Sequence, residues 1–112
     1  MISKWMFKVN VIGKVGTNSS NGEWRQNLES ELSKVSPSLT YGRKLSVDAM
    51  FWINPNRVNG NKLDCDNLAK PVLDAIKKVG ITHDDSLVYD LHVSKHISFA
   101  DEHLELTVSE WA

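Results

Sequence analysis

Cysteine is nearly absent from this sequence, with Cys65 as its single representative among 112 residues. One cysteine excludes an internal disulfide framework and a cysteine-based zinc site, and it fits the reducing cytoplasm in which we expect the protein to act. No apolar run is long enough to span a membrane, so no membrane partner is expected. The first twelve residues alternate apolar and polar side chains, unlike the apolar block of a signal peptide.

The sequence also lacks the short motifs of several common sites. It contains no glycine-rich phosphate loop and no nucleophile elbow. The string DCDNLAKPVLDA has neither the glycine at position six nor the glutamate at position twelve that an EF-hand loop requires. The four histidines, His83, His92, His96 and His103, do not have the spacing of zinc ligands.

What is present predicts one folded domain covering residues 1–112. Hydrophobic residues make up 41% of the chain and include four tryptophans, which supplies enough apolar surface to offset the entropy lost on folding. A chain of this length has no room for a second core.

Charge is divided unevenly along the chain. Residues 1–63 carry nine Lys or Arg against four Asp or Glu, a net charge of +5, whereas residues 64–112 carry four against ten, a net charge of −6. A basic surface beside an acidic pocket suits a protein that holds both phosphates and a cation. The alternative is a solvated surface whose charges cluster by chance.

Hydrophobic periodicity predicts four strands and two helices. Alternation with a period of two predicts strands at about residues 4–12, 45–53, 87–93 and 104–108. A helical period predicts one helix from Trp24, with a capping box of Ser20 and Glu23, that ends before Pro37. A second helical stripe over 68–79 stops at Gly80, and Pro71 predicts that its regular part begins near Lys70.

The element order is therefore β-α-β-α-β-β. This order predicts an α+β fold in which a small mixed β-sheet of about four strands carries both helices on one face.

The segment LDCDNLAKPVLDAIKKVGITHDDS holds two close aspartate pairs, Asp64 with Asp66 and Asp84 with Asp85. If the backbone before the second helix is extended, Asp64 and Asp66 point to the same side. Neighbouring carboxylates raise each other's pKa unless a cation holds them. Mg²⁺, with Mn²⁺ as a substitute, prefers such oxygen ligands, and Asp84 or Asp85 would add a third carboxylate by folding back.

Lys70 follows Asp66 by four residues and precedes Asp74 by four, so it faces the aspartates from the helix. A metal held there would polarise a phosphodiester while Lys70 stabilises charge on the phosphate. The structural alternative is that Asp66 or Asn67 caps the helix, Asp74 makes a surface ion pair, and THDDS is a polar turn.

The string LDCDNLAKPVLDAIKKVGITHDDSLVYDLHVSK resembles the RusA-type Holliday junction resolvases, which are small metal-dependent endonucleases. Their signature reads D-x-D-N-L-x-K-x-x-x-D-A-L, then D-D-x-x-V and a lysine on the following strand. The matching residues here are Asp64, Asp66, Asn67, Leu68, Lys70, Asp74, Ala75, Asp84, Asp85, Val88 and Lys95, with Ile76 replacing the leucine. The resemblance implies an α+β homodimer that recognises four-way DNA junctions and nicks opposing strands.

The resemblance also implies roles for single residues. Asp64, Asp66 and Asp85 would be the catalytic carboxylates that bind magnesium, and Lys70 would be the essential lysine near the scissile phosphate. The supporting residues would be Asn67, Asp74 and Asp84, and Lys95 would contact a phosphate.

The basic segment that family members carry after the first strand is reduced here to Lys14 before Arg25. We expect Lys14 and four other residues to contact DNA, namely Arg43, Lys44, Arg57 and Lys62. The four tryptophans are mostly core candidates by their place in the patterns, although an exposed one could stack on an unpaired base at a junction.

The sequence thus predicts a Mg²⁺-dependent, structure-selective endodeoxyribonuclease that resolves Holliday junctions by paired nicking in DNA recombination or repair. One alternative is a non-catalytic branched-DNA-binding protein of the same fold, which would bind junctions without nicking them. Another is a small α+β interaction module whose aspartates are only caps and turns, and whose thermal stability would not respond to Mg²⁺ or Mn²⁺.

Overall fold

A computed structural model describes residues 6–17, 22–35, 42–60 and 63–111 of the chain. Its elements, in order, are strand β1 (Met6–Ile12), helix α1 (Glu23–Leu32), strand β2 (Leu45–Ile53), helix α2 (Cys65–Lys78), the short 3₁₀ helix η2 (Asp85–Leu87), strand β3 (Val88–Ile97) and strand β4 (His103–Glu110). The predicted α+β element order is confirmed. No helix within the described ranges has the length and apolar content needed to cross a membrane.

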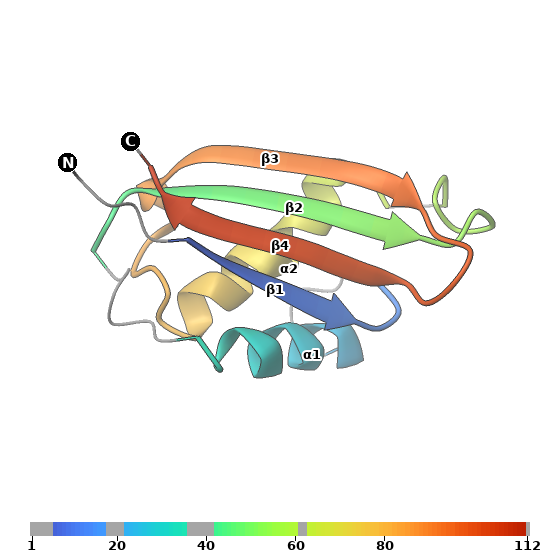
Figure 1. Ribbon diagram of the computed structural model, residues 1–112, viewed down its shortest axis with the longest axis horizontal. Helices are drawn as coiled ribbons and strands as arrows, with labels where there is room; N and C mark the ends of the chain where they lie inside the picture. Colours follow the sequence, from blue (N-terminus) through green and yellow to red (C-terminus); the bar gives the residue numbers. More distant parts are fainter. Residues whose placement is uncertain (1–5, 18–21, 36–41, 61–62, 112) are drawn as a thin grey trace.

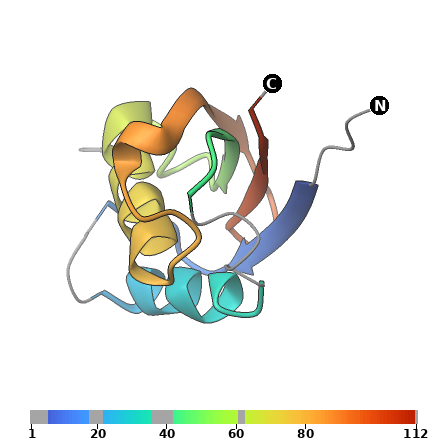
Figure 2. The ribbon, with the colours of Figure 1, turned by 90° about the vertical axis from the view of Figure 1, so that its left-hand side faces the viewer.

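The four strands form one mixed sheet in the order β1-β4-β2-β3. β2 and β3 are parallel, whereas β4 runs antiparallel to both β1 and β2. Both helices cover the same face of the sheet (Figures 1 and 2). α2 provides the crossover that a parallel strand pair requires, so it runs back along the sheet from the end of β2 to the start of β3.

The core lies between the inner face of the sheet and the two helices. Every second residue of β2 is buried there, as the alternation predicts, and the neighbouring β4 contributes Leu104, Leu106 and Val108. The helices add an apolar stripe consisting of Trp24, Leu28, Leu32, Leu68, Val72, Ala75 and Ile76. Full burial of a Val, Leu or Ile side chain contributes about 1.5–3 kcal/mol, so these two periodicities fix which face of each element points inward.

α2 begins earlier than the sequence predicted, because it continues without interruption through the buried Pro71. A proline inside a helix costs roughly 3 kcal/mol. Burial of Leu68, Val72 and Ile76, each at 0–1% exposure, is worth more than that in total at about 1.5–3 kcal/mol per side chain. The predicted stop is confirmed, since Gly80 follows the helix with a φ of 85°.

Other boundaries also differ from the predictions. Gly22 occupies the N-cap position of α1 and makes no side-chain capping bond, while the predicted Ser20 cap lies outside the described residues. β3 continues to Ile97 and β4 extends from His103 to Glu110, because pairing with β2 and β1 persists beyond the stretches that alternate clearly.

Candidate active site

The first aspartate pair lies at the N-terminal end of α2. Asp64 is the N-cap residue, with φ −75° and ψ 153°, yet its side chain makes no capping hydrogen bond. Asp66 belongs to the first helical turn, so the predicted extended backbone is correct for Asp64 and wrong for Asp66. Both side chains are exposed. The partial positive charge of the helix N-terminus favours each carboxylate by about 0.3–1 kcal/mol, which helps the fold to tolerate two like charges here.

Lys70 is exposed one turn beyond Asp66 on the same side of α2. Asp74 follows after another turn, and its carboxylate lies 3.9 Å from Nη1 of Arg25 on α1. Arg25 is buried, and its Nε donates to Glu29 at 2.7 Å. Asp74 therefore contributes to the contact between the two helices, and its predicted support of the metal cluster stays a prediction, as does that of the half-buried Asn67.

The second aspartate pair lies beyond the opposite end of α2. The backbone N–H of Ile81 donates to the carbonyl of Ile76 at 3.0 Å, which keeps the chain at the C-terminal end of the helix as it leads to Asp85. A helix of 14 residues is about 21 Å long at 1.5 Å per residue. Magnesium ligands lie about 2.1 Å from the ion, so Asp85 does not join Asp64 and Asp66 within one chain. Among the described residues, no group of three acidic, histidine or cysteine side chains could hold a metal.

Asp84 and Asp85 are both exposed at the start of η2. The Ser86 hydroxyl donates to Oδ2 of Asp84 at 3.0 Å. This hydrogen bond, assisted by the positive charge of Lys77, lowers the pKa of Asp84 below its ordinary value. The supporting role predicted for Asp84 at a metal site stays a prediction.

Comparison with known families tests the resemblance that the aspartate string carries. The family model described as Endodeoxyribonuclease RusA matches residues 7–109, nearly the whole chain. The chain belongs to the RusA endodeoxyribonuclease family. The resemblance carried by the aspartate string is thereby confirmed, and family membership supports a DNA endonuclease activity. No curated protein matches the chain.

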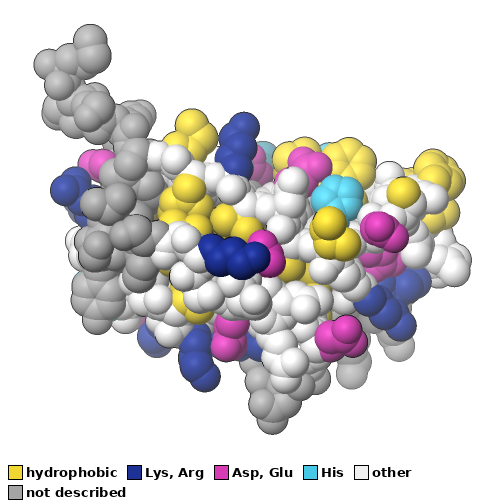
Figure 3. All heavy atoms as spheres, turned by 60° about the horizontal axis from the view of Figure 1, so that its bottom comes forward, with side chains coloured by type: hydrophobic (Ala, Val, Ile, Leu, Met, Phe, Trp, Pro, Cys, Tyr) yellow, Lys and Arg dark blue, Asp and Glu magenta, His cyan; other side chains and the backbone are white. Residues whose placement is uncertain are grey.

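The described basic residues expected to contact DNA in this RusA-family chain are divided between two ends of the sheet, because Lys14 and Arg57 follow β1 and β2, whereas Arg43 and Lys44 precede β2. Figure 3 shows Lys and Arg side chains at separate points on the face it draws, with acidic and apolar side chains between them. Lys14, Arg43 and Lys44 are exposed, and Nη1 of Arg43 lies 3.4 Å from a carboxylate oxygen of Glu110. Lys62 lies outside the described residues.

Arg57 and Lys95 already have partners inside the RusA domain. Nη1 of Arg57 donates to the carboxylate of Glu102, and Nζ of Lys95 donates to the carbonyl of Val58 at 2.8 Å. Both bonds hold the loop between β2 and α2, which leads to Asp64. The two side chains therefore brace this loop, and their predicted contact with phosphate stays a prediction.

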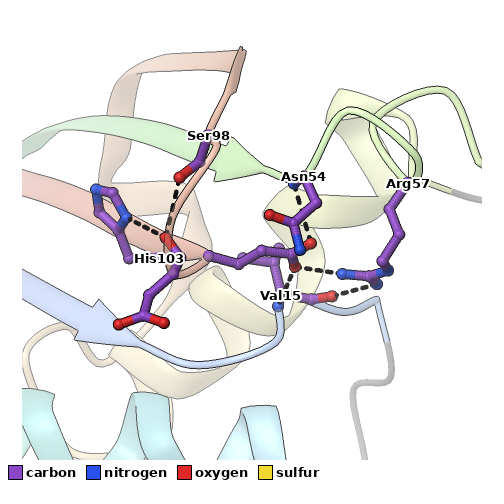
Figure 4. Close-up of polar contacts among 7 residues, drawn as sticks. Val15, Asn54, Arg57, Ser98 and His103 are labelled. Carbon is purple, nitrogen blue, oxygen red and sulfur yellow. Dashed lines mark hydrogen bonds and ion pairs between the residues drawn. The ribbon is translucent and has the colours of Figure 1, made fainter.

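Glu102 is a buried carboxylate that the sequence patterns did not single out. It accepts hydrogen bonds from the backbone N–H of Val15 at 3.1 Å and of Asn54 at 3.0 Å, besides the bond from Arg57. Arg57 also donates to the Val15 carbonyl at 2.8 Å. Figure 4 shows Val15, Asn54 and Arg57 converging from the loops that follow β1 and β2. The side chain of Glu102 is only 4% exposed, a consequence of tertiary packing that no local pattern signals.

The described tryptophans are not all in the core. Trp24 is buried, as predicted. Trp52 lies half-buried on the sheet face opposite the helices, where its ring stacks on His96 at 4.5 Å and on His103 at 5.8 Å between centroids. Trp111 is 40% exposed, so a core position is wrong for this residue. Trp5 lies outside the described residues.

Proposed function

We propose that this RusA-family chain is a Mg²⁺-dependent endodeoxyribonuclease that cuts four-way DNA junctions in recombination or repair, with Mn²⁺ able to substitute. The observation that carries the proposal is the position of Asp64 and Asp66, which expose two carboxylates at the start of α2, one turn before the exposed Lys70.

The donor set fits a hard divalent cation. Asp64 and Asp66 offer only oxygen ligands, and the side chain of the N-cap residue Asp64 makes no capping hydrogen bond. Mg²⁺ typically takes one or two carboxylates and completes its octahedron with waters and phosphate oxygens. A bound Mg²⁺ would polarise the scissile phosphodiester and lower the pKa of a coordinated water. Lys70 would place a positive charge next to the phosphate, where negative charge develops during cleavage.

We infer that each site is shared by two chains. Asp85 is separated from Asp64 and Asp66 by about the length of α2. In a two-fold dimer, every contact from one residue to another is matched by its reciprocal contact. A dimer that brings Asp85 of one chain to the partner's Asp64 and Asp66 therefore contains two equal sites, which suits a nuclease that makes paired nicks in a symmetric junction.

Cleavage of a synthetic four-way junction in Mg²⁺ tests the proposal. We expect Asp66→Asn to abolish nicking, and Lys70→Ala to slow it by about a hundredfold because a group that stabilises developing charge is lost. Lys34→Ala is the matched control, since it removes an exposed lysine that lies neither on α2 nor in the segment leading to Asp85, and it should cut at the wild-type rate.

Wild-type activity in Asp66→Asn or Lys70→Ala would contradict this function. Tight, salt-sensitive junction binding by the wild-type chain without nicking in Mg²⁺ or Mn²⁺ would instead identify a non-catalytic branched-DNA-binding protein.

A further inference from the structure

Lys44, Tyr89 and Trp111 form a cluster at one end of the sheet, where β2 and β3 begin and β4 ends. The ring centroids of Tyr89 and Trp111 are 5.0 Å apart, with an angle of 50° between the ring planes. Nζ of Lys44 lies 5.1 Å from the Tyr89 centroid and 5.9 Å from the Trp111 centroid. The backbone N–H of Trp111 donates to the Lys44 carbonyl at 2.9 Å, so main-chain pairing helps hold the three residues together.

The cluster presents its rings to solvent. Tyr89 is 51% exposed and Trp111 is 40% exposed, and neither belongs to the hydrophobic core. Arg43 is next in the chain to Lys44 and has a side chain that is 58% exposed. Proteins that bind single-stranded nucleic acid combine these two features, because bases stack on exposed aromatic rings while Lys and Arg contact the phosphates.

Tyr89 is four residues after Asp85, with only the last two residues of η2 and the first residue of β3 between them. On the proposed function, Asp85 lies at the scissile phosphate. A DNA strand bound at Asp85 would then pass the cluster within about one or two nucleotides, since an extended chain of four residues spans at most about 14 Å.

We propose that Lys44, Tyr89 and Trp111 form a stacking site for an unpaired nucleobase of branched DNA. This inference rests on the proposed function, because that function places DNA at Asp85. Extruding a base costs least where pairing and stacking are weakest, and in a four-way junction these are the pairs at the branch point, where stacking along the strands is interrupted. The cluster would therefore favour branched over linear DNA without reading the sequence.

Equilibrium binding of a four-way junction and of a linear duplex, measured without divalent cations so that no cleavage occurs, tests this site. We expect Tyr89→Ala and Trp111→Leu each to weaken junction binding by roughly tenfold, as loss of a base-stacking contact does, and to leave duplex binding unchanged. The matched controls Tyr89→Phe and Trp111→Phe keep an aromatic ring and should bind the junction like the wild-type chain.

Salt dependence separates stacking from charge. The aromatic variants should keep the wild-type slope of log K against log salt, whereas Lys44→Gln should reduce its magnitude by about one because one phosphate contact is lost. A 2-aminopurine at the branch point should lose fluorescence on binding the wild-type chain, and this quenching should be weaker with Trp111→Leu.

Unchanged junction affinity in folded Tyr89→Ala and Trp111→Leu would overturn the stacking site, as would an equal loss for junction and duplex. A change of oligomeric state in these variants, with DNA binding intact, would also overturn it and assign the rings to a protein contact. Failure of the nuclease proposal is seen separately, because it is read from nicking by the wild-type chain and by Asp66→Asn. A wild-type chain that binds no junction would overturn both.

Discussion

Glu102 lies in the connection between β3 and β4, next to the loops that follow β1 and β2. Its carboxylate accepts hydrogen bonds from buried donors in both loops, which would otherwise bind water. Its partners are the N–H groups of Val15 and Asn54 and the guanidinium of Arg57. Arg57 was expected to contact DNA, yet a side chain that is 26% exposed and paired to a buried carboxylate is first of all a brace for the loop before Asp64. Arg57 therefore affects the candidate site by holding the loop before Asp64 in position, and not by contacting the substrate.

Replacing Glu102 tests this brace. We expect Glu102→Ala to lower the free energy of unfolding by about 3 kcal/mol, because the change leaves Arg57 and two backbone N–H groups without their acceptor. Urea denaturation measures the loss. Asp101→Ala is the control, since the turn uses the carbonyl of Asp101 for its hydrogen bonds, and it should change stability by less than about 0.5 kcal/mol. A loss below about 1 kcal/mol in Glu102→Ala would mean that water substitutes for the carboxylate.

At the scale of single elements, α2 determines where each aspartate pair lies. Burial of its apolar stripe carries the helix through Pro71, and Gly80 ends it by adopting a φ of 85°. The turn at Gly80 then leads the chain into η2 and β3, so both the length of the helix and its stop set the separation of Asp64 from Asp85. A change in either would move one pair relative to the sheet.

Two glycine substitutions with opposite expected effects on stability test whether the conformation of Gly80 ends α2. Gly80→Ala should destabilise the fold by about 1–2 kcal/mol, because a residue with a Cβ is strained in the left-handed region. Gly42→Ala should be neutral or stabilise by up to about 1 kcal/mol, because an added Cβ there meets nothing within 4 Å. Thermal unfolding of the two variants side by side gives the comparison, and equal effects would argue against a conformational role for Gly80.

At the scale of the whole molecule, the separation of the two aspartate pairs means that one chain does not bring the three proposed metal ligands together. One chain offers Asp64, Asp66 and Lys70 at one end of α2 and Asp85 beyond the other, with no three-ligand group among the described residues. The proposed dimer resolves this by reciprocal exchange, and it would also present each exposed basic residue twice. In the proposed dimer, the exposed basic residues of the two chains would thereby reach several arms of a branched DNA.

Mixing inactive subunits distinguishes shared sites from sites within one chain. Asp66→Asn and Asp85→Asn should each be inactive alone, but their mixed dimer should regain nicking, because one of its two sites receives Asp64 and Asp66 from one chain and Asp85 from the other, all intact. Mixing Asp64→Asn with Asp66→Asn should restore nothing, since every site then contains a damaged pair. Gel analysis of junction nicking after subunit exchange reads the result, and no recovery in the first mixture would contradict the shared site.

Much of the fold was predictable from local patterns. The alternation in β2 and the helical spacing of Leu68, Val72 and Ile76 identify buried faces because each depends only on neighbours along the chain. The Pro71 prediction failed for a reason that is not local, since the helix start is set by how much apolar surface the sheet offers to α2. Asp64, Asp66 and Lys70 were found as a group because they lie within two helical turns of each other.

The sequence by itself determined the order of the elements and the family, because these depend on residue type and on spacing along the chain. Only the tertiary structure decided the strand order, the burial of Glu102, the cluster of Lys44, Tyr89 and Trp111, and the placement of Asp85 far from Asp64. Each of these depends on contacts between segments that are distant in the chain. Such contacts are set by how the faces of whole elements pack together.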